Sequence, residues 1–120
     1  MLSHHGKYVV AESDGNANAN KHEVGPSAVW IVSLKENNQV TFKGVHGKFL
    51  GAKYDGRANA NSQNVGPPEI FTVKERGNGR FNFESYRRKY LVAEESGALN
   101  ANRAIASIWE IFLVKPYDGK

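Results

Sequence analysis

The sequence predicts an all-β protein with a β-trefoil fold, in which three equivalent units contribute twelve short strands to one core. Three observations lead to this prediction. The chain aligns with itself at a shift of 41 residues without a gap, its twelve glycines indicate frequent turns, and no stretch shows a sustained period of 3.6 residues. A unit of this size cannot bury its own apolar face. We therefore expect a single domain over residues 1–120, with repeats 5–45, 46–86 and 87–120.

The internal repeat is strongest between the first two copies. Residues 5–32 and 46–73 are identical at 14 of 28 aligned positions, and residues 87–114 form a more divergent third copy. Twofold alternation places Val9 and Ala11 on one buried face of the first strand. Turn residues separate four apolar segments in each copy. In the first copy, the expected strands are residues 6–12, 17–20, 29–32 and 39–43.

Equivalent apolar residues of the three copies are expected to meet in layers at the centre of the domain. One predicted layer consists of Val9, Leu50 and Leu91. A second consists of Trp30, Phe71 and Phe112, with Val32, Val73 and Val114 beside it. Truncating a buried aromatic residue of such a layer costs about 3–5 kcal/mol of stability.

The two ends of the chain are expected to meet and to share the twelfth strand. Met1 lies four residues before His5, as Phe42 lies four residues before His46. Residues 1–3 can therefore form the second half of the strand, with Met1 in the place of the phenylalanine. The first half of this twelfth strand, equivalent to Val40 in the first copy, has no counterpart in the sequence. The barrel should therefore be weakest at this half-strand. Excision from a longer polypeptide would explain the gap equally well.

Composition restricts the classes of function. The formal charge of +4 and a pI of about 9.4 favour acidic partners. There is no cysteine, which excludes disulfides and cysteine-based metal sites. No N-glycosylation motif and no apolar run of membrane-spanning length occur, so a cytoplasmic protein without membrane insertion is expected.

Catalysis has little support in the residues. No Gly-x-Ser-x-Gly motif is present, and the imidazoles belong to His4, His5, His22 and His46. His5 and His46 occupy equivalent positions at the start of a strand, where hydrogen bonding within a turn is the favoured role. We therefore expect no enzyme, no cofactor and no metal site.

The phrase that the chain repeats allows two interpretations. It reads DGNANAN at 14–20, DGRANAN at 55–61 and SGALNAN at 96–102. The favoured interpretation is structural, because Asp-Gly forms a tight turn and small alanines suit a crowded barrel mouth. The alternative is a set of sugar-binding pockets, since amides and carboxylates hydrogen-bond to hydroxyl groups. The candidate sugar ligands are then Asp14, Asn18, Asp55, Asn59 and Asn100.

Several of these motifs resemble the fascins, a family of actin-bundling proteins built from β-trefoil domains. The similar residues are HGKY and HGKF, each followed by a strand that ends in Ala, then DG and VGP, and SYRRKYL at the start of the third copy. The resemblance covers essentially the whole chain. It extends to the single trefoils of the hisactophilin type and to some plant agglutinins.

The resemblance implies a non-enzymatic module that binds or cross-links actin filaments. Cationic residues at the openings of the strands would contact the acidic filament surface. The candidate contacts are Lys7, Lys48, Arg87, Arg88 and Lys89. The alternative function is a lectin with up to three equivalent pockets. Nucleic acid is not expected as a partner, because the core should take most aromatic residues and leave no platform for bases.

Overall fold

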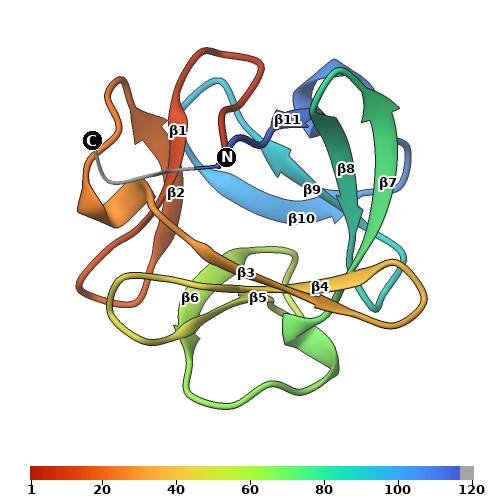
Figure 1. Cartoon of the computed structure of the whole chain (residues 1–120), viewed down its shortest axis with the longest axis horizontal. Coiled ribbons are helices and arrows are strands. Elements are labelled where there is room, and N and C mark those ends of the chain that lie inside the picture. Colours follow the sequence, from red (N-terminus) through yellow and green to blue (C-terminus); the bar gives the residue numbers. More distant parts are fainter. Residues whose placement is uncertain (117–120) are drawn as a thin grey trace.

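The computed structural model describes residues 1–116 as short strands joined by tight turns (Figure 1). The eleven strands of this part of the chain are β1 (Tyr8–Ala11), β2 (Ala17–Lys21), β3 (Ile31–Lys35), β4 (Gln39–Lys43), β5 (Phe49–Ala52), β6 (Ala58–Ser62), β7 (Phe71–Gly77), β8 (Arg80–Glu84), β9 (Tyr90–Ala93), β10 (Leu99–Arg103) and β11 (Phe112–Leu113). Single 3-10 turns occupy Pro26–Ala28 (η1), Pro67–Glu69 (η2) and Ile108–Glu110 (η3). The all-β prediction is confirmed, and the described residues contain eleven of the twelve expected strands.

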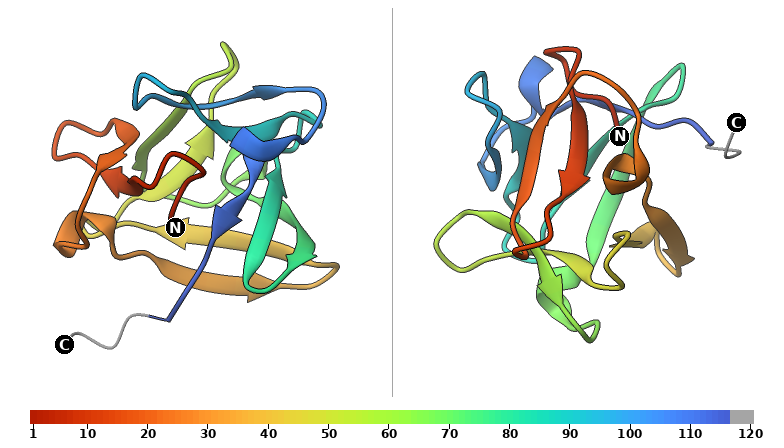
Figure 2. Two further views of the ribbon diagram at one scale, coloured as in Figure 1. Left: turned by 90° about the horizontal axis from the view of Figure 1, so that it is seen from above. Right: turned by 90° about the vertical axis from the view of Figure 1, so that its left-hand side faces the viewer.

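Antiparallel hairpins assemble into a sheet that curls into a nearly closed barrel. Its strand order is β10-β9-β8-β7-β4-β5-β6, with β11 on β8 and β3 on β4, while β1 and β2 form a separate hairpin (Figure 2). None of the short helical turns within residues 1–116 has the length and apolar character needed to cross a membrane.

Each third strand begins later than the sequence pattern predicts. In the first copy the expected segment was 29–32, but β3 starts at Ile31. Pro26 opens the preceding 3-10 turn, and the Val29 N–H donates a hydrogen bond to the Pro26 carbonyl at 3.2 Å. Proline favours the first position of a helical turn because its φ is fixed and it has no N–H to satisfy.

The predicted layers are correct in two copies and incomplete in the first. Val9, Leu50 and Leu91 are fully buried, as are Phe71 and Phe112. Trp30 is only half-buried, and its indole N–H donates a hydrogen bond to the Val9 carbonyl at 2.9 Å. Val73 and Val114 are partly buried against the core, whereas Val32 is 41% exposed. The expected burial of Val32 is therefore wrong.

The repeated phrase joins the three copies to one another. The turn glycines Gly15, Gly56 and Gly97 have φ values of 92°, 93° and 95°. The carbonyl of each glycine accepts a backbone hydrogen bond of 2.8–2.9 Å from the alanine of the Asn-Ala-Asn triplet in another copy. In the same order as the glycines, these donors are Ala60, Ala101 and Ala19. The asparagine after each alanine packs against the same glycine. We call these contacts the central ring, consisting of Gly15–Asn61, Gly56–Asn102 and Gly97–Asn20.

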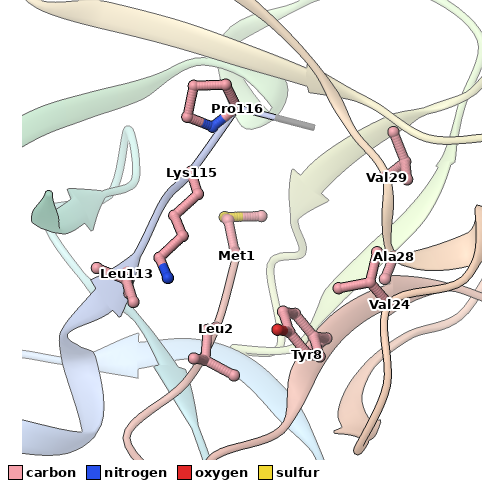
Figure 3. A pocket seen from close by; sticks show the side chains of 9 residues that line it. All are labelled: Met1, Leu2, Tyr8, Val24, Ala28, Val29, Leu113, Lys115 and Pro116. Atoms are coloured by element: carbon pink, nitrogen blue, oxygen red, sulfur yellow. The ribbon is translucent and has the colours of Figure 1, made fainter. Parts of the chain in front are cut away.

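The first residues of the chain meet β11, the last described strand, as the sequence predicts. Leu2 and Leu113 exchange two backbone hydrogen bonds of 2.8 Å, and the Met1 carbonyl accepts a hydrogen bond from the Val9 N–H. The Met1 side chain packs against the core in the position expected for the third phenylalanine. Burial lowers the pKa of the Met1 amino group from 8.0 to about 6. Leu2 therefore makes the two pairings, with Leu113 and Tyr8 (Figure 3), that the ends of β4 and β8 make in the other copies.

Candidate functional site

The turns that precede β1, β5 and β9 share one backbone geometry. In each, an N–H donates a hydrogen bond of 2.8–2.9 Å to the carbonyl of the lysine four residues later; these lysines are Lys7, Lys48 and Lys89. The residue before each lysine has a positive φ, with values of 75° at Gly6, 79° at Gly47 and 62° at Arg88. We call the third of these turns, Ser85–Lys89, the basic turn.

The basic turn carries backbone strain that the other two turns avoid. A positive φ suits glycine, but it brings the Cβ atom of any other residue close to the backbone. Arg88 adopts this conformation at the position where Gly6 and Gly47 stand in the other copies. Strain of this kind persists where the surrounding structure enforces it and clusters at functional sites, so it makes this turn a candidate site.

Arg87 lies against two exposed tyrosines. Its guanidinium carbon is 4.3 Å from the ring centroid of Tyr54 and 6.0 Å from that of Tyr86. Tyr54 is 82% exposed and Tyr86 is 45% exposed. The hydroxyl of Tyr86, with a smaller effect of Tyr54, raises the pKa of Arg87 above its ordinary value. The sequence predicted that the core would take most aromatic residues, and Tyr54 and Tyr86 are exceptions that lie exposed beside a cation.

The cations of the basic turn are exposed and form no ion pair with the described residues. Within residues 1–116 the ion pairs involve Arg57, Lys74 and Arg103, and none involves the basic turn. Lys7 and Lys48 lie in the two other turns and are half-buried. Of the five predicted filament contacts, the chain thus gathers only Arg87, Arg88 and Lys89 at one place, and Tyr54 joins them from the turn after β5.

Four of the five candidate sugar ligands are engaged in side-chain hydrogen bonds within the chain. Asp14 accepts the N–H of Asn16 at 3.0 Å, and Asp55 accepts that of Arg57 at 3.1 Å, which lowers the pKa of Asp55. The side-chain amide of Asn18 donates to Glu12 at 3.0 Å. Asn100 donates to Glu94 at 2.9 Å, and Asn59 lies at the equivalent position of the second copy. This geometry favours the structural interpretation of the repeated phrase.

His5 contacts the third copy of the chain. The Nε2 atom of His5 lies 3.0 Å from the Ala93 carbonyl, and its ring meets that of Trp109 edge-on. Residues 1–116 hold no cluster of three side chains suited to bind a metal ion. For His5, the structural role is thus a contact between the first and third copies, not the hydrogen bond within a turn that the sequence suggested.

Comparison with known proteins connects the fold to one family. The family model of the FRG1-like domain matches residues 18–118, which covers most of the three copies and includes the basic turn. No curated protein matches the sequence.

Proposed function

Because the chain belongs to the family of FRG1-like domains, whose fold is β-trefoil-like and related to that of fascin, we propose that it is a non-enzymatic module that binds actin filaments. The basic turn is the proposed contact, with Tyr54 beside it. The protein would then be cytoplasmic and associated with the cytoskeleton, and cross-linking of filaments would require a second binding surface or a second copy.

We further propose that the barrel is a β-trefoil. The three copies would form a β-trefoil with approximate threefold symmetry, and residues 1–2 would stand for its twelfth strand. The central ring supports this, because the same glycine–asparagine contact joins the first copy to the second, the second to the third and the third to the first.

The strained backbone of Arg88 is the observation that carries the proposed site. A left-handed conformation costs a non-glycine residue about 1–2 kcal/mol. Two copies of the same turn avoid that cost with glycine, so stability alone would favour glycine in the third. The arginine adds a third adjacent cation to Arg87 and Lys89, which together suit the acidic surface of a filament.

Reversal of charge in the basic turn is expected to weaken filament binding without unfolding the protein. In the triple variant Arg87→Glu, Arg88→Glu and Lys89→Glu, the fraction that pellets with actin filaments should fall, most clearly at low salt. The melting temperature should change little, because exposed charges contribute about 0–1 kcal/mol each. Co-sedimentation across a salt series measures the first effect and circular dichroism the second.

A matched control separates the site from net charge. The exposed cations Lys21, Lys35 and Arg76 lie outside the basic turn and form no ion pair within residues 1–116. Reversing these three changes the net charge by the same amount, and this variant should pellet nearly as well as the wild type. Equal losses in both variants would mean that bulk charge, and not the basic turn, determines binding.

Arg88→Gly is expected to separate stability from function. Relief of the left-handed strain should raise the free energy of unfolding by about 1 kcal/mol, while loss of one cation weakens filament binding. The reverse change, Gly47→Arg, should destabilise the protein by a similar amount. Urea denaturation of both variants measures these effects. A less stable Arg88→Gly variant would show that the arginine serves the fold, and the basic turn would lose its main support.

Binding to sugars is the outcome that would replace this proposal. A glycan array tests it directly on the wild-type protein. Specific binding that falls in steps in Asn18→Ala and Asn59→Ala, together with no pelleting on filaments, would assign the repeated phrase to sugar recognition.

A further inference from the structure

Tyr54 lies at the tip of the hairpin formed by β5 and β6, outside both strands. The Gly56 N–H closes the turn by donating a hydrogen bond of 3.0 Å to the Lys53 carbonyl. The Tyr54 side chain is 82% exposed, which makes it the most exposed tyrosine within residues 1–116. Another protein can therefore reach its hydroxyl group without any opening of the core.

The other tyrosines of the described chain are less accessible. Tyr8 and Tyr90 are half-buried, and the Tyr90 hydroxyl accepts a hydrogen bond of 2.9 Å from the Lys74 ammonium group. Tyr86 is 45% exposed, about half as much as Tyr54. An enzyme that modifies tyrosine hydroxyls on the folded protein would therefore meet Tyr54 first.

Arg87 is placed to receive an anionic group on the Tyr54 oxygen. Its guanidinium carbon lies 4.3 Å from the centroid of the Tyr54 ring. A phosphate on the hydroxyl would lie at the edge of the same ring, so small side-chain rotations would bring it to the guanidinium. Arginine binds phosphate through two parallel N–H···O bonds. The adjacent acid, Asp55, is already paired with Arg57 at 2.9 Å.

The equivalent turns show that this position accepts a negative charge. Steps of 41 residues relate Tyr54 to Ser13 and to Glu95, and both of these residues are exposed. The turn that carries the Glu95 carboxylate closes in the same way, because the Gly97 N–H donates to the Glu94 carbonyl at 3.0 Å. The fold thus requires neither a tyrosine nor a neutral side chain here, and a charge added at Tyr54 should leave it intact.

We propose that Tyr54 is a site of reversible phosphorylation that inactivates the basic turn. A tyrosine kinase would transfer the γ-phosphoryl group of ATP to the Tyr54 hydroxyl oxygen. A bond forms between this oxygen and phosphorus, the bond from phosphorus to the β–γ bridging oxygen breaks, ADP leaves, and the phenolic proton passes to a base of the kinase. A phosphatase would reverse the change by hydrolysis, which releases inorganic phosphate.

The phosphate would compete with an acidic partner for the cations of the basic turn. It carries a charge of about −1.5 to −2 at neutral pH, and the turn has three cations, Arg87, Arg88 and Lys89. Pairing with Arg87 would occupy the N–H donors of the guanidinium, and the remaining negative charge would repel an acidic filament surface. This consequence rests on the function proposed above, whereas the pairing of the phosphate with Arg87 does not.

The first measurement asks whether the folded protein is a substrate. A tyrosine kinase is selected that phosphorylates, with ATP, a synthetic peptide reproducing residues 49–62. The wild-type chain is then treated in the same way, and mass spectrometry locates the phosphate. We expect modification at Tyr54 and much slower modification at Tyr86. A chain that stays unmodified at Tyr54 would refute the proposal, because the fold would then withhold a hydroxyl that the kinase accepts in the peptide.

Phosphorus NMR of the phosphorylated chain tests the ion pair without any use of actin. The second pKa of a phosphorylated tyrosine is about 6, and a neighbouring guanidinium favours the dianion. The pKa of the phosphate should therefore be lower in the wild-type chain than in the Arg87→Ala variant. Equal values in the two proteins would show that Arg87 does not bind the phosphate, and the proposal would be wrong.

Co-sedimentation tests the effect on filament binding. The phosphorylated chain should pellet less than the untreated chain, and phosphatase treatment should restore pelleting. Kinase treatment should not change the pelleting of Tyr54→Phe, which lacks the acceptor oxygen. Tyr54→Glu should pellet less than Tyr54→Gln, which isolates the effect of charge. As a matched control, Ser13→Glu adds a carboxylate to the equivalent turn of the first copy and should pellet nearly as well as the wild type.

The results distinguish this inference from the function on which it rests. Absence of pelleting by the untreated wild-type chain would refute filament binding, and regulation of that binding with it. Pelleting that phosphate at Tyr54 leaves unchanged would keep filament binding and overturn only the regulation. Equal losses in Tyr54→Glu and Ser13→Glu would assign the effect to net charge, which also contradicts a specific role of Tyr54.

Discussion

Phe71→Ala is expected to lower the free energy of unfolding by about 3–5 kcal/mol. The Phe71 ring is fully buried and lies 5.8 Å from that of Phe42, at the centre of the shared core. Its removal would leave a cavity that the surrounding strands cannot fill. Since small domains have stabilities of about 5–15 kcal/mol, this loss is a large part of the total. Urea denaturation followed by circular dichroism measures it.

Trp30 is the natural comparison, because it holds the equivalent position in the first copy. Trp30→Ala should cost less than Phe71→Ala although tryptophan is larger, since the Trp30 side chain is only partly buried whereas Phe71 is fully buried. Equal losses in the two variants would indicate that Trp30 is as deeply packed as Phe71.

Gly15→Ala is expected to destabilise the protein by about 2–4 kcal/mol. A Cβ atom at this position would lie 2.9 Å from the Cβ atom of Asn61, and the φ of 92° adds strain for any residue other than glycine. One added methyl group would therefore push apart the first and second copies at the central ring. Thermal and urea unfolding of the purified variant measure the effect.

Two other glycines separate the causes of this loss. Gly6 has a positive φ and Gly25 does not, and a Cβ atom added at either would meet nothing within 4 Å. Gly6→Ala should therefore show the cost of backbone strain alone, about 1–2 kcal/mol, and Gly25→Ala should be nearly neutral. If Gly15→Ala costs no more than Gly6→Ala, the close contact in the central ring does not contribute to stability.

The repeat predicts much of the fold because equivalent apolar residues must converge on one core. It identified the layer of Val9, Leu50 and Leu91, and it placed Met1 beside the end of the chain. The repeat did not predict the exposure of Ile31 and Val32 in β3. A hairpin pattern in the sequence does not indicate which strands of different copies are neighbours. The expectation of a short ladder at the end of the chain agrees with the two residues of β11.

The functional site was harder to predict, for two physical reasons. Tyr54 and Arg87 are 33 residues apart and do not occupy equivalent positions, so no period relates them and only the folded chain brings them together. The strain at Arg88 is a backbone property that composition does not display. One signal was available in the alignment of the copies, because Arg88 stands where Gly6 and Gly47 stand, and the loss of a turn glycine indicates a residue kept for another purpose.

The central ring has a consequence for how the protein is made. The hydrogen bond from Ala19 to Gly97 joins the first copy to the third across 78 residues of sequence. While a ribosome has released only the first two copies, β2 can pair with β1 but cannot make this contact. Closing so long a loop is slow compared with forming a hairpin. We therefore expect the growing chain to collapse into hairpins first, and to gain its cooperative stability only when the third copy has emerged.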